Sequence, residues 1–247
     1  MNIKLNPNER IDQLYSNNIK IIQSSEVFSF SLDAVLLADF VKSSNKQQTI
    51  VDLCSGNGAV GLFISNKLTG KIYEVEIQAR LADMAKRSVL LNSLEKRMTV
   101  INDDLENSTN YIKKDSVDTL VCNPPYFLNY PTSKKNPNPY LAIARHEVKT
   151  TIEKVSLTTS DLLKMNGNAY FVYRPDRLVD LLLAFRKYRL EPKEIRFVRP
   201  RINENANMVL LRAVKDGKKD GAKILQDLIT HEGNHYSKEV RKMLYGE

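Results

Sequence analysis

Residues 49–214 alternate between short apolar runs and segments of helical periodicity, and this alternation restricts the fold more than any other feature of the sequence. Strands that alternate with helices form a parallel sheet with helices on both faces. Two consecutive strands at the end of the series predict an antiparallel terminal strand. The expected fold class is therefore α/β, with a seven-stranded, mostly parallel sheet. The expected strands cover residues 49–54, 71–76, 98–102, 117–122, 168–173, 194–198 and 208–214, and the expected helices cover residues 59–68, 78–92, 152–163 and 177–188.

The chain length of 247 residues predicts a single domain, because no repeat or long linker divides the sequence. We expect an N-terminal extension at 1–48, a core at 49–214 and a basic helical extension at 215–247. Within the first part, the runs IKIIQ and VFSF predict a short strand pair, followed by an apolar helix from Asp33 to Val41. The N-terminus has no apolar segment of signal-peptide type, so we expect a cytoplasmic protein that does not enter a membrane.

Positive charge is concentrated near the C-terminus. The formal net charge is +8, and residues 174–247 contain 17 Lys and Arg against 11 Asp and Glu. An excess of this kind attracts a polyanion and makes its binding depend on salt. A solvated, lysine-rich surface without a partner explains the same charge equally well.

A glycine-rich loop follows the first strand of the core. The run DLCSGNGAVG, from Asp52 to Gly61, contains the pattern G-x-G-x-x-G and opens a helix. Glycines allow a tight turn and a close approach of the backbone to a ligand. Glu76 ends the next strand, 20 residues after Gly56, where a carboxylate can meet ribose hydroxyls. These features predict an adenosyl cofactor, which is either a nicotinamide dinucleotide or S-adenosylmethionine.

Acidic residues beside this loop favour S-adenosylmethionine. Asp52, just before the glycines, would repel a pyrophosphate but could pair with the ammonium group of a methionine moiety. Asp103 and Asp104 follow the third strand and could accept a hydrogen bond from the adenine amino group, and Asp104 is the preferred candidate of the two. An acidic helix N-cap is an equally good interpretation of this pair.

The run VCNPPYF, residues 121–127, ends the fourth strand in two prolines. Proline has no backbone N–H and a fixed φ, so the chain leaves the sheet in a stiff, defined direction. Such a turn can hold the Asn123 side chain, the Pro124 carbonyl and the Tyr126 ring in a fixed mutual geometry. A rigid structural turn explains Pro124 and Pro125 but not the polar and aromatic residues that flank them.

In this order and spacing, VDLCSGNGAVGL, YEVE, INDDL and NPPY resemble class I amino-methyltransferases, over roughly residues 28–214. The resemblance implies a Rossmann-like fold and S-adenosylmethionine as the cofactor. It implies that Asn123 Oδ1 and the Pro124 carbonyl accept hydrogen bonds from a planar exocyclic amine, while Tyr126 stacks on a flipped base. The expected catalytic residues are Asn123, Pro124, Pro125 and Tyr126, and the expected cofactor-binding residues are Asp33, Asp52, Ser55, Gly56, Gly58, Glu76, Asp103, Asp104 and Asn123.

Three further runs, FSFSLDAVLLADF, ARHE and YSKEVRKMLYGE, are similar to bacterial tRNA1(Val) N6-adenine methyltransferases, which modify the adenine beside the anticodon. This resemblance implies tRNA as the partner, with no metal. It places Phe28, Phe30 and Asp33 in a lid near the cofactor. The implied substrate contacts are Tyr126, Phe127, Arg145 and His146, and the candidate phosphate contacts are Arg199, Arg201, Lys218, Lys219, Arg241 and Lys242.

Other functions stay open on the sequence alone. The NPPY tetrapeptide also occurs in enzymes that methylate a glutamine of release factors, and ribosomal RNA methyltransferases of N6-adenine or N2-guanine are a further alternative. A non-catalytic RNA-binding scaffold has no chemical need for the complete motif set. Cys54 and Cys122 show no C-x-x-C spacing, and His231 with His235 have no evident third ligand, so we expect no metal site.

Overall fold

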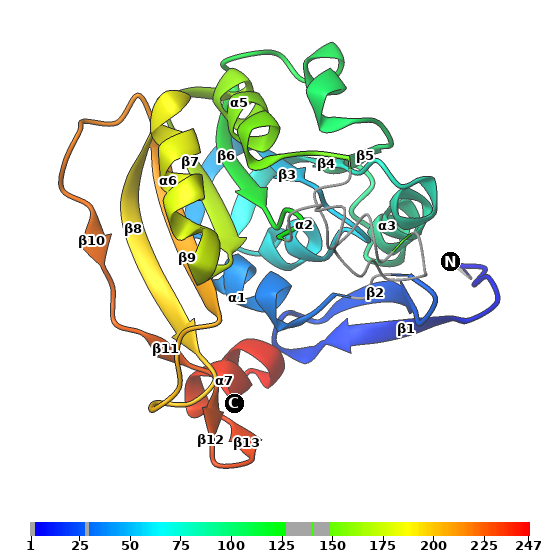
Figure 1. Ribbon diagram of the computed structural model, residues 1–247. Helices are drawn as coiled ribbons and strands as arrows, with labels where there is room; N and C mark the ends of the chain where they lie inside the picture. Colours follow the sequence, from blue (N-terminus) through cyan, green and yellow to red (C-terminus); the bar gives the residue numbers. More distant parts are fainter. Residues whose placement is uncertain (1–2, 28–29, 127–139, 141–148) are drawn as a thin grey trace, which may run out of the picture.

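The computed structural model describes residues 3–27, 30–126, 140 and 149–247. Its centre is a twisted sheet in which the long strands follow the order β8-β9-β7-β6-β3-β4-β5 (Figure 1). β9 runs antiparallel to both of its neighbours, and the other pairs among these strands are parallel, so the predicted sheet is confirmed. The strands are β3 (Ser44–Leu53), β4 (Leu68–Val75), β5 (Met98–Ile101), β6 (Val117–Cys122), β7 (Leu163–Tyr173), β8 (Leu190–Arg199) and β9 (Met208–Lys215).

Helices cover both faces of this sheet (Figure 1). Because side chains alternate along a strand, Tyr170 and Val172 of β7 pack with one set of helices, and Ala169 and Phe171 pack with the other. The first set contains α1 (Leu32–Phe40), α2 (Ala59–Ile64) and α7 (Lys238–Tyr245), with α3 (Ala79–Leu91) beside them, and the second contains α5 (Ile152–Leu162) and α6 (Leu178–Lys187).

The N-terminal hairpin uses different strands from those expected. β2 (Ile19–Ser24) pairs antiparallel with β1 (Glu9–Leu14), and the expected partner run, 27–30, lies partly outside the described residues. Val27 instead lies in a turn, where its N–H donates to the Ser24 carbonyl. An ion pair of 2.6 Å between Glu9 and Arg87 of α3 fixes β1 beside the core.

The C-terminal extension is mostly extended and not helical as expected. β10 (Lys223–Ile224) and β11 (Leu228–Ile229) add short parallel pairs to β8, and β12 (His231–Glu232) pairs with β13 (His235–Tyr236). Glycines at 217, 221 and 233 interrupt any helical pattern there. Its one described helix, α7, buries Val240 against the core, and the Ser16 hydroxyl donates to the Met243 carbonyl.

The expected helix at 59–68 stops at Ile64, because the chain turns at Ser65 and begins β4 at Leu68. The other expected elements of the core lie within a few residues of the observed ones. None of the helices in the described ranges is long and apolar enough to span a membrane.

Candidate active site

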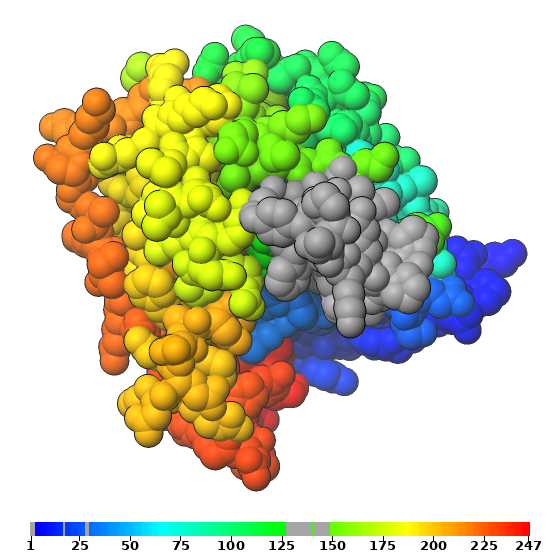
Figure 2. Space-filling view, in the orientation of Figure 1, coloured from blue at the N-terminus to red at the C-terminus, as the bar shows by residue number. Residues whose placement is uncertain are grey.

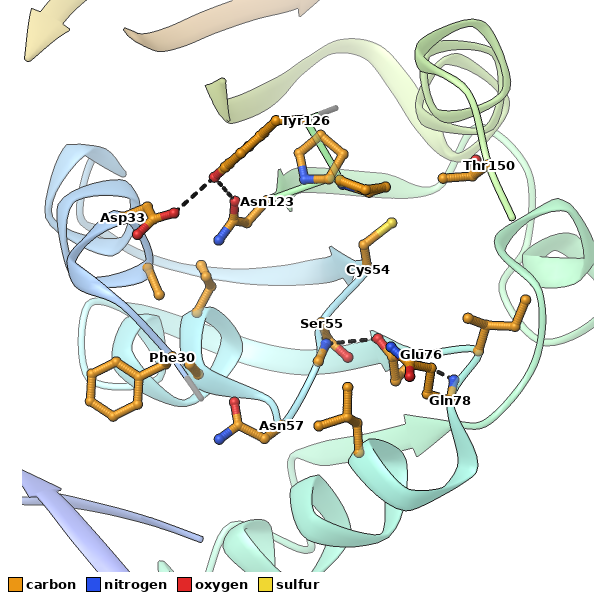
Figure 3. Close-up of a pocket in the computed structure, with 18 of the residues that line it drawn as sticks. Phe30, Asp33, Cys54, Ser55, Asn57, Glu76, Gln78, Asn123, Tyr126 and Thr150 are labelled. Atoms are coloured by element: carbon orange, nitrogen blue, oxygen red, sulfur yellow. Dashed lines mark hydrogen bonds between the residues drawn. The ribbon is translucent and has the colours of Figure 1, made fainter. Parts of the chain in front are cut away.

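A cavity of about 680 Å³ lies at the carboxyl ends of β3, β4 and β6 (Figure 3). The order of the sheet reverses between β3 and β6, and ligands of open α/β sheets bind at such a point. The cavity is lined by the glycine loop, by residues 75–78, 103–105 and 123–126, and by part of the segment before α1. Gly56 and Tyr126, which are 70 residues apart in the sequence, therefore line the same cavity.

The glycine loop turns tightly over the end of β4. Gly56 and Gly58 have φ values of +58° and +83°, which favour glycine. The Gly58 N–H donates to the Ser55 carbonyl at 2.9 Å, and the Ser55 N–H donates to the Val75 carbonyl at 3.1 Å. A Cβ atom on Gly58 would lie 2.7 Å from Glu74 Oε2, so a side chain at this position meets both backbone strain and a clash.

Glu76 points into the cavity with both oxygens already oriented. Oε2 accepts from the Gly56 N–H, and Oε1 accepts from the Gln78 N–H, each at 2.8 Å. Burial raises the pKa of Glu76 to about 7, although these two backbone donors oppose the shift. Each oxygen keeps a further lone pair, so the carboxylate can accept from ribose hydroxyls, in the role predicted for it.

Asp52 does not reach the cavity, contrary to the predicted contact with a ligand ammonium. Its side chain is fully buried, and Oδ2 accepts from the Gly61 N–H at 2.8 Å. Glu74, its register partner on β4, is fully buried beside it. Burial raises the pKa of Asp52 to about 8, and burial together with the Asp52 charge raises the pKa of Glu74 well above its usual range. Asp52 and Glu74 thus pack against the glycine loop on its buried side.

Asp103 and Asp104 both line the cavity. Asp104 is the N-cap of a short 3-10 helix, where Oδ1 accepts from the Glu106 N–H at 3.1 Å. Asp103 accepts from Asn107 Nδ2 and from the Tyr111 hydroxyl, each at 2.8 Å, and these bonds lower the pKa of Asp103. The capping interpretation is confirmed for Asp104, but that bond uses Oδ1 alone, so the preference for Asp104 over Asp103 as the adenine acceptor stays a prediction.

The Asn-Pro-Pro-Tyr segment lies across the cavity from Glu76 (Figure 3). The Tyr126 hydroxyl is within hydrogen-bonding distance of Asn123 Oδ1 and lies 3.0 Å from Asp33 Oδ2. Burial, followed by the charge of Asp33, raises the pKa of Tyr126 well above its usual range. Asp33 therefore contacts the Asn-Pro-Pro-Tyr motif, which the sequence did not indicate.

Neighbouring side chains fix the Tyr126 ring. It packs edge-on against Tyr173, with a centroid distance of 5.7 Å and an interplanar angle of 84°. Arg177 Nη1 donates to the Tyr126 carbonyl at 3.3 Å. These contacts hold the Tyr126 ring at the cavity wall.

Polar atoms that the sequence did not single out also face the cavity. Gln78 Oε1, Thr150 Oγ1 and Ser55 Oγ are buried without a hydrogen-bond partner, and their residues line the cavity. Of these residues only Ser55 was predicted. Because buried polar atoms are normally paired, the three are expected to meet a ligand or water. The signal for Gln78 was its position two residues after Glu76, whereas Thr150 has no motif.

The predicted phosphate contacts lie outside the cavity. Arg199 pairs with Asp227 at 2.5 Å, and Arg201 pairs with Glu204 at 2.9 Å. Figure 2 shows the turn after β8 (gold) and the C-terminal segment (orange to red) as one continuous surface.

Phe28, Phe127, Arg145 and His146 lie outside the described residues. Phe30 does line the cavity and packs edge-on against Phe63, at 5.1 Å between ring centroids. Within the described ranges, no group of three or more His, Cys, Asp or Glu side chains is arranged to hold a metal ion.

Comparison with protein families gives a match to the methyltransferase small domain over residues 18–177. The tRNA1(Val) (adenine(37)-N6)-methyltransferase of Porphyromonas gingivalis is 27% identical over 155 residues, which is 62% of this chain and 60% of that protein. The protein of the same name from Bacteroides thetaiotaomicron is 29% identical over 160 residues, which is 64% of this chain and 65% of that protein. The match thus spans about 60% of the length of the first of these relatives.

Solved structures share the fold. A predicted O-methyltransferase from Agrobacterium tumefaciens has a TM-score of 0.69 at 22% identity, over 87% of this chain and 96% of that chain. A geranyl diphosphate C-methyltransferase from Streptomyces coelicolor, solved with S-adenosyl-L-homocysteine, has a TM-score of 0.54 at 13% identity, over 74% of this chain and 79% of that chain. At these identities the likeness concerns the fold alone.

Proposed function

The chain belongs to the methyltransferase small domain family, and from this premise we propose that it transfers a methyl group from S-adenosylmethionine to the exocyclic N6 amine of an adenine in tRNA. The expected Rossmann-like fold of class I methyltransferases is confirmed by the sheet order and by the solved methyltransferases that share it. The observation that supports the proposal most strongly is that Glu76 and Asn123 line the same cavity.

The cofactor half of the proposal rests on the carboxylates of the cavity. Glu76 would hold the ribose hydroxyls, and Asp103 or Asp104 would accept from the adenine amino group, with Asp104 preferred. The orphaned atoms Gln78 Oε1 and Ser55 Oγ supply further polar contacts for an adenosyl ligand. When bound, S-adenosylmethionine would supply an electrophilic methyl group on a sulfonium.

The substrate half rests on the acceptors of the Asn-Pro-Pro-Tyr segment. An adenine amine is a poor nucleophile because its lone pair is delocalised into the ring. Asn123 Oδ1 and the Pro124 carbonyl can each accept one N–H, which favours a tetrahedral nitrogen with its lone pair free to attack. With the cofactor bound, this lone pair would take the methyl group as the carbon–sulfur bond breaks, and the methylated amine would release one proton to solvent. The Tyr126 ring offers a stacking surface, and such stacking is worth about 1–3 kcal/mol per base.

The choice of tRNA is supported by the names of the relatives and by the basic excess of the chain. We further propose the anticodon-loop adenine of tRNA1(Val) as the target. A loop adenine is partly unstacked, so flipping it into the cavity costs less than in a duplex. A tRNA substrate agrees with the expected cytoplasmic location.

The first experiment is a transfer assay. The purified protein is incubated with labelled S-adenosylmethionine and total tRNA that lacks the endogenous modification, and the digested nucleosides are identified by mass spectrometry. We expect N6-methyladenosine with the wild type. Asn123→Ala should lower turnover on the order of 10²–10³-fold, as for the loss of one preorganised polar contact in other enzymes.

The alternatives have their own outcomes in this assay. Labelled cofactor that binds without any transfer to RNA would exclude the tRNA proposal and direct the assay to a release-factor glutamine. Transfer to ribosomal RNA but not to tRNA would exclude tRNA as the substrate and would leave the proposed methylation of an exocyclic amine unchanged. Full turnover of Asn123→Ala would exclude the role given to that side chain.

A further inference from the structure

The Tyr126 hydroxyl stands between two acceptors but has one proton to donate. Asp33 Oδ2 lies 3.0 Å from it, and Asn123 Oδ1 is within hydrogen-bonding distance on the other side (Figure 3). A phenol donates to one acceptor at full strength, and a bond to a carboxylate is roughly twice as strong as a bond to a neutral amide. Both contacts are close enough for a hydrogen bond, and the charge of Asp33 favours donation to Asp33 over donation to Asn123.

We propose that Asp33 is a positioning residue, whose carboxylate holds the Tyr126 proton so that Asn123 Oδ1 stays available to the substrate amine. This inference rests on the proposed function of Asn123. Without Asp33, Tyr126 would donate to Asn123 Oδ1. That bond would occupy one lone pair and withdraw electron density from the oxygen, which makes it a weaker acceptor for a substrate N–H.

Both ends of the Asp33–Tyr126 bond are fixed by packing. Asp33 lies in the first turn of α1, and the Ser31 hydroxyl donates to its other oxygen, Oδ1. The five residues that follow it in α1 are all buried, so the helix has little freedom to move. Tyr126 is held by the ring of Tyr173. The geometry thus joins the N-terminal extension directly to the catalytic motif, 93 residues away in the chain.

The test is a double-mutant cycle of Asp33→Ala and Tyr126→Phe in the transfer assay. We expect Asp33→Ala to lower kcat by about tenfold or more, with less than about a twofold change in the dissociation constant of S-adenosylmethionine by calorimetry. In the Tyr126→Phe background the same substitution should cause no further loss, because no competing proton remains. Asp39→Ala is the matched control, since this exposed aspartate lies on the same helix outside the cavity.

Two results would overturn the proposal. An equal loss from Asp33→Ala in both backgrounds would mean that Asp33 acts independently of Tyr126. A loss of cofactor affinity as large as the loss of turnover would mean that Asp33 holds the cofactor directly, which is the role that the sequence predicted for it.

A second cycle needs no substrate and separates this proposal from the proposed function. Each single substitution should lower the Tm, and the double substitution should lower it no further than the larger of the two effects, because both remove the same bond. If the decreases in Tm of the two single variants add in the double variant, the Asp33–Tyr126 bond is excluded. This conclusion does not depend on the substrate of the wild-type protein. If the two effects do not add and the wild type methylates no RNA, the proposed function fails, and with it the role of Asp33 in catalysis.

Discussion

Glu76 Oε2 accepts a hydrogen bond from the Gly56 N–H at 2.8 Å, which ties the end of β4 to the glycine loop. The bond joins two motifs that are 20 residues apart in the chain. Together with the bond from the Gln78 N–H to Oε1, it fixes the rotamer of the Glu76 side chain. The group is therefore preorganised for a ligand, and its charge depends on pH near neutrality.

The first prediction concerns the pH dependence of cofactor binding. Burial raises the pKa of Glu76 to about 7, and in the proposed role the ribose hydroxyls would donate to its ionised form. Affinity for S-adenosylmethionine should therefore be full above this pKa and should fall as the pH decreases below it, approaching tenfold per pH unit. Calorimetric titrations from about pH 5.5 to about pH 8.5 measure this dependence.

Glu76→Gln provides the control for that profile. It should bind the cofactor about 10–100-fold more weakly at high pH, because a charged acceptor is lost and the Gln78 N–H faces an amide nitrogen. Its profile should lack the decrease below about pH 7. The ionisation of the cofactor is common to both proteins, so identical profiles would contradict the role of Glu76.

The second prediction concerns stability and pH. Burial raises the pKa of Asp52 to about 8, so the folded protein holds a proton that the unfolded chain releases from about pH 4 upwards. The contribution of this proton to the free energy of unfolding is fully present below the pKa that Asp52 has in the unfolded chain. It is lost as the pH rises towards the folded pKa, by at most about 1.4 kcal/mol per pH unit.

Asp52→Asn tests this slope, because it keeps an oxygen for the Gly61 N–H and cannot ionise. Urea unfolding between about pH 5 and about pH 8 should show a weaker loss of stability in the variant than in the wild type. Asp115→Asn changes an exposed carboxylate in the same way and should keep the wild-type slope. Equal slopes in all three proteins would mean that Asp52 is ionised in the folded state.

The order of the elements could be predicted from the sequence because it depends on local patterns. Apolar runs in β3, β4, β6 and β7 and the periodicity of α3 and α6 are visible in single segments. The N-terminal hairpin could not be predicted in the same way. Its partner strand, Glu9–Leu14, has only two apolar residues and no alternation of polar and apolar side chains. It is fixed by an ion pair from Glu9 to Arg87, 78 residues away.

A sequence motif was enough to predict which residues line the cavity in several cases. The prediction failed where the position of a side chain depends on the exact end of a strand or on a contact with a residue far away in the chain. β4 ends at Val75, so Glu76 projects beyond the sheet, whereas Asp52 lies inside β3 and is buried. Asp52 is in register with Glu74, so Glu76 lies two residues further along the strand direction, and this shift separates the two outcomes. The contact of Asp33 with Tyr126 depends on how α1 docks and has no local signal.

The third prediction concerns the close contact between the glycine loop and Glu74. A Cβ atom on Gly61 would lie 2.5 Å from Glu74 Oε1, so Gly61→Ala should destabilise the protein by about 1–3 kcal/mol through overpacking. Glu74→Ala removes the atoms that clash. The loss from Gly61→Ala should therefore be smaller in that background, as measured by chemical denaturation of the four proteins.

Gly58→Ala is the contrasting case for the same cycle. Its Cβ atom also meets Glu74, at 2.7 Å, but Gly58 has a φ of +83°. Backbone strain of about 1–3 kcal/mol then persists after Glu74 is shortened. Complete relief at both positions, with no residual loss for Gly58→Ala in the Glu74→Ala background, would contradict the assignment of backbone strain to Gly58.

The fourth prediction concerns the approach of tRNA to the cavity. Lys149 is exposed and lines the cavity, so a flipped adenine would place the adjoining phosphates near its ammonium group. Lys149→Ala should weaken tRNA binding severalfold, and the slope of log affinity against log salt should decrease by about one unit. Filter binding at several salt concentrations measures both quantities.

Two comparisons make that test specific. Lys46→Ala removes an exposed lysine near the start of β3, at the opposite end of the sheet from the cavity, and should change neither affinity nor slope. Arg199→Ala removes the ion pair with Asp227 and should therefore lower the Tm. It should change the salt slope of tRNA binding little, because this guanidinium already has an internal partner. A reduced slope for Lys46→Ala would mean that tRNA is attracted by the overall charge of the chain, and the cavity mouth would then have no special part in its capture.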